Sequence, residues 1–176
     1  MSHPGTSITI RRAVVTDAPA LAEFGRRTFH DTFAPDNDPA DMAAYLAEAF
    51  APEKQAAQLA APGRTCLFAE VDGALVGYAC LMDGAQHRDA GGAHPVELER
   101  FYVDRRWHGR GVAAPLMMAV VQYARAVGAD VLWLGVWERN ARAIAYYRKQ
   151  GFERVGAQTF HLGADVQTDD VMRRAL

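Results

Sequence analysis

The spacing of apolar positions changes several times along the chain, from every second residue to every third or fourth. Residues 8–13 (ITIRRA) alternate and predict a first strand. Thr16 and Asp17 then precede Ala18-Pro19, a combination typical of a helix start, and a helical pattern follows to Phe29. The positions expected to face inward on this helix are Leu21, Phe24 and Thr28.

The next segment predicts two further helices and a hairpin. Asp38-Pro39 opens a second helix, and a short third one precedes Pro62-Gly63. Residues 65–82 alternate on both sides of Asp72-Gly73, and Asp-Gly between alternating segments is a strong hairpin signal. Two antiparallel strands are therefore expected here. The polar, glycine-rich residues 83–94 predict a loop.

The second half of the chain alternates strands with helices. Residues 95–103 predict a strand, and apolar residues then recur at helical spacing from Val112 to Val127. A buried strand at 130–137 and a helix at 138–150 follow. This order predicts a parallel crossover unit, so the fold class is mixed α/β. Strand-like segments around 153–160 and 166–173 would complete the sheet.

Composition restricts the setting. The chain has 176 residues, half of them hydrophobic, and shows no repeat or linker, which predicts a single domain over residues 1–176. Positive and negative side chains nearly cancel to a net charge of −2, so no nucleic-acid or membrane partner is expected. The start MSHPGTSITI has no leader-like pattern, and the longest apolar segment, residues 112–121, is too short to span a bilayer. We expect a cytoplasmic protein whose two cysteines, Cys66 and Cys80, are free thiols packed in the core.

A basic, glycine-containing turn precedes the helix that starts near Val112. Glycines let a backbone approach a ligand closely, and a helix N-terminus presents unpaired N–H groups and a positive dipole. An anion is the natural ligand, and a pyrophosphate suits the number of cationic side chains better than a single carboxylate. A solvated surface turn is the alternative. The cationic side chains are those of Arg105, Arg106, His108 and Arg110.

Two kinds of cofactor turn match these residues. Gly109, Gly111 and Ala114 fit a dinucleotide-binding fingerprint, with Glu138 in the place of the ribose-binding acid. That match is weak, because residues 104–108 intervene between the strand and the first glycine, and because the upstream chain predicts a hairpin.

The second match is more extensive. Residues 108–113 (HGRGVA) resemble the acetyl-CoA turn of the Gcn5-related N-acetyltransferase (GNAT) family, Gln/Arg-x-x-Gly-x-Gly/Ala, with His108 in place of the usual first residue. Residues 97–103 (ELERFYV) resemble the central strand of that family. Residues 136–152 (VWERNARAIAYYRKQGF) resemble its second cofactor motif, with Asn140 and Tyr147 in the expected places.

The resemblance implies a GNAT-type fold. Such a fold has a mixed, mostly antiparallel sheet of about six to seven strands flanked by helices, with the acetyl-CoA turn between the central strand and the next helix. It also implies direct transfer from the thioester to an amine, with no nucleophilic cysteine, and we assign no metal ligand. The residues it assigns to acetyl-CoA are Phe101, Tyr102, Val103, His108, Gly109, Arg110, Gly111, Val112, Ala113, Ala114 and Asn140.

The chemistry requires a base, since an alkylammonium with a pKa of about 10.4 is almost fully protonated at neutral pH. Glu97 and Glu99 are two apart on one predicted strand and so share a face. The resemblance places the base, acting through water, at one of them, and we favour Glu99 because it is nearer the cofactor. Tyr147 holds the family's acid position, whereas Tyr146 is about 100° away on the helix. Asn140 also stands where the N-cap of this helix is expected.

The acceptor is the least defined part of the prediction. Residues 28–53 contain no Lys or Arg but six acidic side chains, which would attract amines if they border the site and otherwise serve as caps or a solvated face. Residues 28–50 and 160–176 resemble a bacterial branch of the family that includes polyamine acetyltransferases. A small cationic amine is therefore the leading acceptor. The alternatives are another amine (an amino acid, an antibiotic or a protein N-terminus) or a non-catalytic CoA-binding regulator. The sequence does not decide between a monomer and a homodimer.

Overall fold

A seven-stranded sheet forms the centre of the computed structural model, which describes residues 7–176. The strand order is β1-β2-β3-β4-β5-β7-β6, and within the described residues only β4 and β5 run parallel. The predicted mixed, mostly antiparallel sheet is confirmed. The strands are β1 (Ile8–Arg12), β2 (Arg64–Val71), β3 (Ala74–Asp83), β4 (Pro95–Val103), β5 (Val131–Trp137), β6 (Glu153–Leu162) and β7 (Asp165–Ala175). The start MSHPGT, where no leader was expected, lies outside the described residues.

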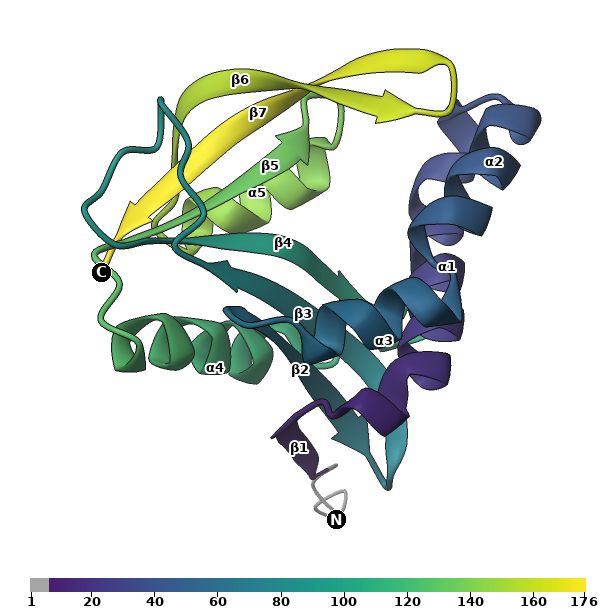
Figure 1. Ribbon diagram of the computed structural model, residues 1–176, viewed down its shortest axis with the longest axis horizontal. Coiled ribbons are helices and arrows are strands. Elements are labelled where there is room, and N and C mark those ends of the chain that lie inside the picture. Colours follow the sequence, from purple (N-terminus) through teal and green to yellow (C-terminus); the bar gives the residue numbers. More distant parts are fainter. Residues whose placement is uncertain (1–6) are drawn as a thin grey trace.

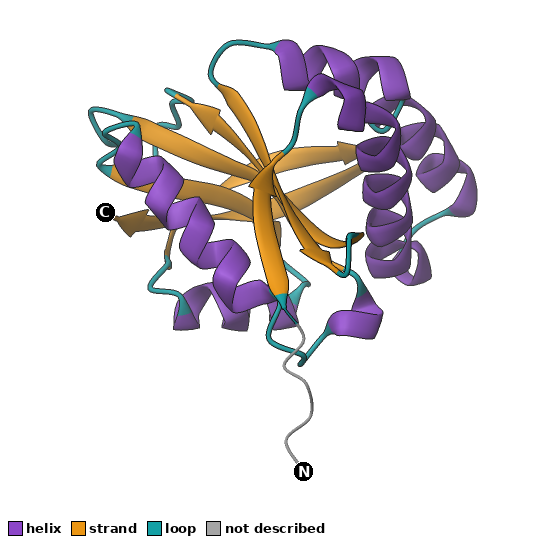
Figure 2. Ribbon diagram, turned by 90° about the horizontal axis from the view of Figure 1, so that it is seen from below, coloured by secondary structure: helices purple, strands orange, loops and turns teal. Residues whose placement is uncertain are grey.

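Helices cover both faces of the sheet (Figure 2). One face carries α4, which packs on β1, β2 and β3, and α5, which shares its apolar core. The other side carries α1, α2 and α3 (Figure 1). No helix in the part of the chain described here is long and apolar enough to cross a membrane. The bounds are α1 (Ala18–Phe33), α2 (Pro39–Ala49), α3 (Pro52–Ala60), α4 (Ala113–Ala126) and α5 (Ala141–Lys149).

Local sequence signals account for several element boundaries. The side chain of Asp38 accepts hydrogen bonds from the backbone N–H groups of Ala40 and Asp41, so the predicted N-cap of α2 is confirmed. Asp72 and Gly73 both have positive φ, 50° and 77°, as a two-residue hairpin turn between twisted strands requires. The predicted inward positions Leu21, Phe24 and Thr28 of α1 are all buried.

The parallel pairing of β4 and β5 is short. It joins three residues of each strand, Pro95–Glu97 with Val131–Trp133, and the two strands then diverge. They start close together and separate along their length in Figure 1. In the described part of the chain, the opening leaves one edge of residues 98–103 without a neighbouring strand, and backbone polar groups on that edge need other partners.

The two cysteines are not free thiols as predicted, because Cys66 and Cys80 form a disulfide across β2 and β3. Their Cα atoms are 4.1 Å apart. A register shift at Ala69 and Glu70 brings the two residues opposite each other, whereas the unshifted hairpin would pair Cys66 with Ala79. Counting cysteines could not reveal this shift. The expected cytoplasmic location was based partly on free thiols, and the disulfide removes that argument.

We predict that the disulfide contributes about 3 kcal/mol to the free energy of unfolding, since it closes a loop with a sequence separation of 14. Urea denaturation of the parent and of the Cys66→Ala/Cys80→Ala variant measures this difference. In addition, alkylation of the denatured, unreduced parent should modify neither thiol, whereas alkylation after reduction should modify both. Two modified thiols before reduction would contradict the bond.

Candidate active site

Two cavities meet in the opening between β4 and β5. The smaller one, about 140 Å³, is the aromatic cavity, whose walls include Phe29, Phe33, Tyr45, Trp137 and Phe160. The larger one, about 480 Å³, is the basic cavity, whose walls include Arg105, His108 and Arg142. Five residues line both cavities and mark the junction: Phe101, Tyr102, Asn140, Ala143 and Tyr147.

Tyr147 therefore lies where a group bound in one cavity could reach a group bound in the other. It is 8% exposed, and its ring makes an edge contact with Phe152, which also lies in the core. Burial raises the pKa of its hydroxyl well above the ordinary value, and the neighbouring Tyr146 adds to the shift. The hydroxyl thus keeps its proton at neutral pH and can donate it or a hydrogen bond.

The turn before α4 has a backbone suited to an anion. Gly109 and Gly111 have φ of 75° and 82°, and apart from their chain neighbours no described residue has an atom within 4 Å of where a Cβ would stand. Within residues 7–176, no side chain caps the N-terminus of α4, unlike those of α2 and α5. The four cationic side chains of this turn do not all face the same site, in contrast to the prediction. Arg105 and His108 line the basic cavity, whereas Arg106 pairs with Asp104 and Arg110 stacks on Trp107.

Not every residue assigned to the cofactor lines the basic cavity. Phe101, Tyr102, Val103, His108, Ala113 and Asn140 do so. Gly109, Arg110, Gly111, Val112 and Ala114 do not, and Val112 is instead buried in the core beneath the turn. Backbone donation from these residues stays a prediction.

His108 joins the two sides of the opening. Its Nε2 lies 2.8 Å from the carbonyl oxygen of Val103, and its Nδ1 lies 2.7 Å from Nη1 of Arg142 on α5. Because a guanidinium can only donate, Nδ1 must accept, and the ring proton on Nε2 is donated to Val103. Sequence reasoning missed Arg142. This residue lies in the first turn of α5, contacts His108, and adds a second guanidinium to that of Arg105 in the basic cavity.

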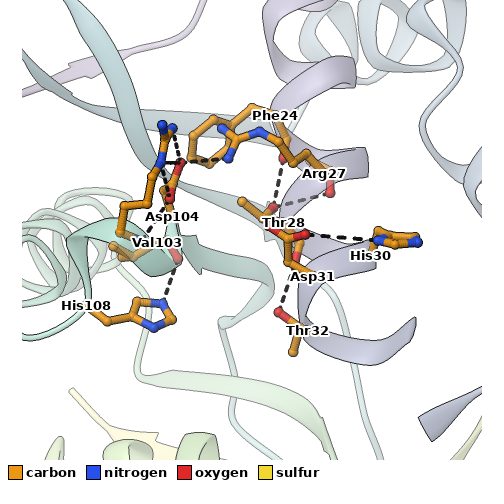
Figure 3. A network of polar contacts seen from close by, with 11 residues as sticks. Phe24, Arg27, Thr28, His30, Asp31, Thr32, Val103, Asp104 and His108 are labelled. Atoms are coloured by element: carbon orange, nitrogen blue, oxygen red, sulfur yellow. Dashed lines mark hydrogen bonds and ion pairs between the residues drawn. The ribbon is translucent and has the colours of Figure 1, made fainter. Parts of the chain in front are cut away.

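Asp104 holds the turn that precedes α4 (residues 105–112, called the glycine turn) against α1 (Figure 3). It is 2% exposed, and its carboxylate accepts hydrogen bonds from the side chains of Arg106 and Arg27. It also accepts from the backbone N–H of Arg106 and so caps the short helix Arg105–Trp107. Arg106 and Arg27 hold the pKa of this carboxyl well below its usual range. The turn is thus fixed to the rest of the fold by a buried, fully charged group.

The two candidate bases differ in their surroundings. Glu99 has no partner residue in β3 because of a register shift, it lines the aromatic cavity, and it forms an ion pair with Arg64. Glu97 is not among the residues lining either cavity. Burial, together with the nearby charge of Glu99, raises the pKa of Glu97 to about 7. Of the two glutamates, Glu99 is the one that lines a cavity, and its ion pair with Arg64 is a feature that sequence reasoning did not identify.

Asn140 and Tyr146 have structural contacts of their own. Asn140 caps α5 as predicted, because its Oδ1 accepts from the backbone N–H of Ala143 at 3.1 Å. The two amide protons on Nδ2 are left for another partner, and the residue lines both cavities. Tyr146 does not face away from the site as expected. It lines the basic cavity, and its hydroxyl donates to the carbonyl oxygen of Ala113.

The acidic segment before β2 contributes little to the aromatic cavity. Asp38 caps α2, Asp41 accepts a hydrogen bond from the backbone N–H of Ala164, and Asp31 lines the basic cavity. The acids that line the aromatic cavity are Glu99 and Asp169 of β7. Sequence reasoning missed Asp169, although an aspartate inside a strand is unusual enough to be a signal.

The comparisons with known proteins agree with this geometry. Residues 26–152 match the acetyltransferase (GNAT) family. An uncharacterized N-acetyltransferase of Lactobacillus delbrueckii subsp. lactis is 36% identical over 172 residues, which cover 97% of this chain and 99% of that protein. A spermine/spermidine N(1)-acetyltransferase of Bacillus subtilis is 29% identical over 91 residues, 51% of this chain and 60% of that protein.

The same fold occurs in a solved structure. The PaiA N-acetyltransferase of Thermoplasma acidophilum, in complex with coenzyme A, superposes with a TM-score of 0.77 at 20% identity and covers 97% of this chain and 99% of its own. The dinucleotide-binding alternative is excluded, because antiparallel strands precede the glycine turn and the order of the seven described strands is not that of a doubly wound sheet. The chain belongs to the acetyltransferase (GNAT) family.

Proposed function

We propose that this protein transfers the acetyl group of acetyl-CoA directly to a primary amine, and that the leading acceptor is a small cationic amine such as a polyamine. The observation that carries the proposal is the junction at Tyr147, where a basic cavity meets a cavity lined by aromatic rings and carboxylates. An anionic donor and a cationic acceptor would enter from opposite sides. Relatives that match only part of this chain are named for different acceptors, namely spermine and spermidine, a protein α-amino group, and streptothricin. The choice of acceptor therefore rests on the aromatic cavity of this chain.

Acetyl-CoA fits the basic cavity. Arg105 and Arg142 line it, and the uncapped N-terminus of α4 adds unpaired N–H groups for the pyrophosphate. The free edge of Phe101–Val103 offers backbone groups for the pantetheine arm, as an edge strand does for an added strand. When bound, acetyl-CoA supplies a thioester whose carbonyl carbon accepts the amine.

The protein side of the reaction uses three groups. Glu99 takes the proton of the acceptor ammonium through water, since its carboxylate lines the aromatic cavity. A backbone N–H within Phe101–Val103 stabilises negative charge on the carbonyl oxygen. Tyr147 donates a hydrogen bond to the departing sulfur and keeps its own proton because its pKa is raised. The C–S bond then breaks to give the CoA thiolate, and the second proton of the amine passes to solvent.

Release of the CoA thiol against a panel of amines tests the function. We expect turnover with at least one small cationic amine. Tyr147→Phe should lower kcat by roughly 100-fold in single-turnover measurements and leave acetyl-CoA affinity within a few-fold. Tyr123→Phe is the matched control, because the Tyr123 hydroxyl accepts from Thr65 and lies outside both cavities. Acetyl-CoA binding without turnover on any amine would instead support a CoA-binding regulator.

A second prediction distinguishes the two glutamates. Glu99→Gln keeps the shape and removes the proton acceptor, so kcat/KM should fall about 100-fold near pH 7 and recover partly as rising pH frees the amine. Glu97→Gln should change kcat/KM less than about 3-fold at the same pH. The pH profiles of both variants, with their melting curves, check this. A loss confined to Glu97→Gln would reverse the assignment of the base.

A third prediction concerns the glycine turn. Asn and Asp tolerate positive φ similarly and differ in charge, so Gly111→Asn and Gly111→Asp form a matched pair. Calorimetry should show acetyl-CoA binding at least about tenfold weaker for Gly111→Asp than for Gly111→Asn, and a smaller difference at high salt. Equal affinities of the two variants would argue against a bound anion at this turn.

A further inference from the structure

The aromatic cavity contains a buried carboxylate that neither the fold nor the proposed chemistry has used. Asp169 lies on β7, paired with Trp137 of β5 on one side and with Gln158 of β6 on the other. It is 8% exposed and lines the cavity. Among the described residues, none forms an ion pair or side-chain hydrogen bond with it, while the adjacent Asp170 pairs with Arg154.

Burial and the neighbouring Asp170 raise the pKa of Asp169 to about 6, so it is mostly ionised at neutral pH. A buried charge without a counter-ion is unfavourable, and such a group is normally paired or serves a ligand. Arg100 also lines the cavity, but its guanidinium donates to Gln55 and to the carbonyl oxygen of Ala49 and lies over the ring of Phe50. No ion pair joins it to Asp169 among the described residues, so this carboxylate is left for a cation supplied by a ligand.

The walls around Asp169 are suited to a cation on an alkyl chain. Tyr45 and Phe160 are in edge contact with ring centroids 5.5 Å apart, and Phe33 and Trp137 are in a similar arrangement at 5.9 Å. Aromatic faces attract ammonium groups electrostatically and pack against methylene groups. Gly135 leaves room for the side chains of its neighbours, because a Cβ at this position would clash with Nε2 of Gln158 and stand 3.2 Å from Oδ2 of Asp169.

The position of Asp169 relative to the junction determines which nitrogen it would bind. Tyr147 and Asn140 line both cavities, whereas Asp169, Tyr45 and Phe160 line the aromatic cavity alone. Asp169 is therefore outside the junction, and a second charged group of the acceptor could contact it while the first reacts near Tyr147.

We propose that Asp169, together with Tyr45, Trp137 and Phe160, binds a second cationic nitrogen of the acceptor, so that alkyl diamines and longer polyamines are preferred over monoamines. This inference rests on the proposed function, since it assigns the acceptor cavity of the same site. It makes Asp169 a residue that determines specificity without taking part in the chemical step.

The test compares diamines of three to five carbons, and spermidine, with monoamines of the same chain length. For the parent, kcat/KM should be at least about tenfold higher for the best diamine than for its monoamine, as a charge-assisted contact implies. Asp169→Asn should raise KM for the diamine at least about tenfold, with kcat within about 3-fold and the monoamine unaffected. Asp72→Asn is the matched control, because the hairpin turn accepts Asn-Gly equally well and lies outside both cavities.

Several outcomes would overturn the inference. Equal kcat/KM for diamine and monoamine in the parent would do so without any variant. An equal loss on both acceptors in Asp169→Asn would show a merely structural role. If no amine is acetylated, the proposed function fails, and calorimetric titration of 1,4-diaminobutane still decides on the site: binding by the parent that Asp169→Asn abolishes supports it, and absence of binding to the parent overturns it.

Discussion

The separation of β4 from β5 after three paired residues is the constraint on which the rest of the site depends. A continuous parallel ladder would close the space that both cavities occupy. Because the strands diverge, one edge of Phe101–Val103 is free and the helices that follow the two strands, α4 and α5, present their N-termini near the opening. The fold thereby places unpaired backbone donors and two positive helix ends around one gap.

An opening in a sheet needs contacts that hold its two sides in place. Asp104 does this on the β4 side, since its buried carboxylate joins the glycine turn to Arg27 of α1. His108 does it across the gap, through Val103 on one side and Arg142 on the other. The carboxylate of Asp104 and the ring of His108 each make directional hydrogen bonds to two partners, so their positions are fixed. Fixed positions suit a site that must keep two substrates aligned.

Most of the fold follows from local signals. Asp38-Pro39, Asp72-Gly73 and the spacing from Val112 to Val127 each predict their element within a few residues, because caps, tight turns and apolar periodicity are set by neighbours in sequence. Features that depend on the register between strands were not predicted. A register shift at Ala69 and Glu70 places the two cysteines opposite each other, and a shift in the pairing of β3 with β4 leaves Glu99, which pairs with Arg64, without a partner residue in β3.

The candidate site was predictable where a contiguous motif carries it and not where distant strands meet. The turn at 108–113, the segment containing Asn140 and Tyr147, and the strand containing Glu99 can each be read alone. Asp169 becomes informative only when β7 is placed between β5 and β6, and Arg142 only when α5 is placed opposite the glycine turn. Pairing between strands far apart in sequence is the step that a single sequence specifies least.

The charges of the two cavities give the site a direction. Arg105 and Arg142 line the basic cavity, and Glu99 and Asp169 line the aromatic one, with Tyr147 between them. Each cavity also has one side chain of the opposite sign, Asp31 in the basic cavity and Arg100 in the aromatic one. The two cavities meet at the buried, protonated hydroxyl of Tyr147, and the rings of Phe101 and Tyr102 also line both of them. Burial lowers the local dielectric at the junction, so the same burial that raises the pKa of Tyr147 also strengthens the electrostatic interactions of charged groups beside it.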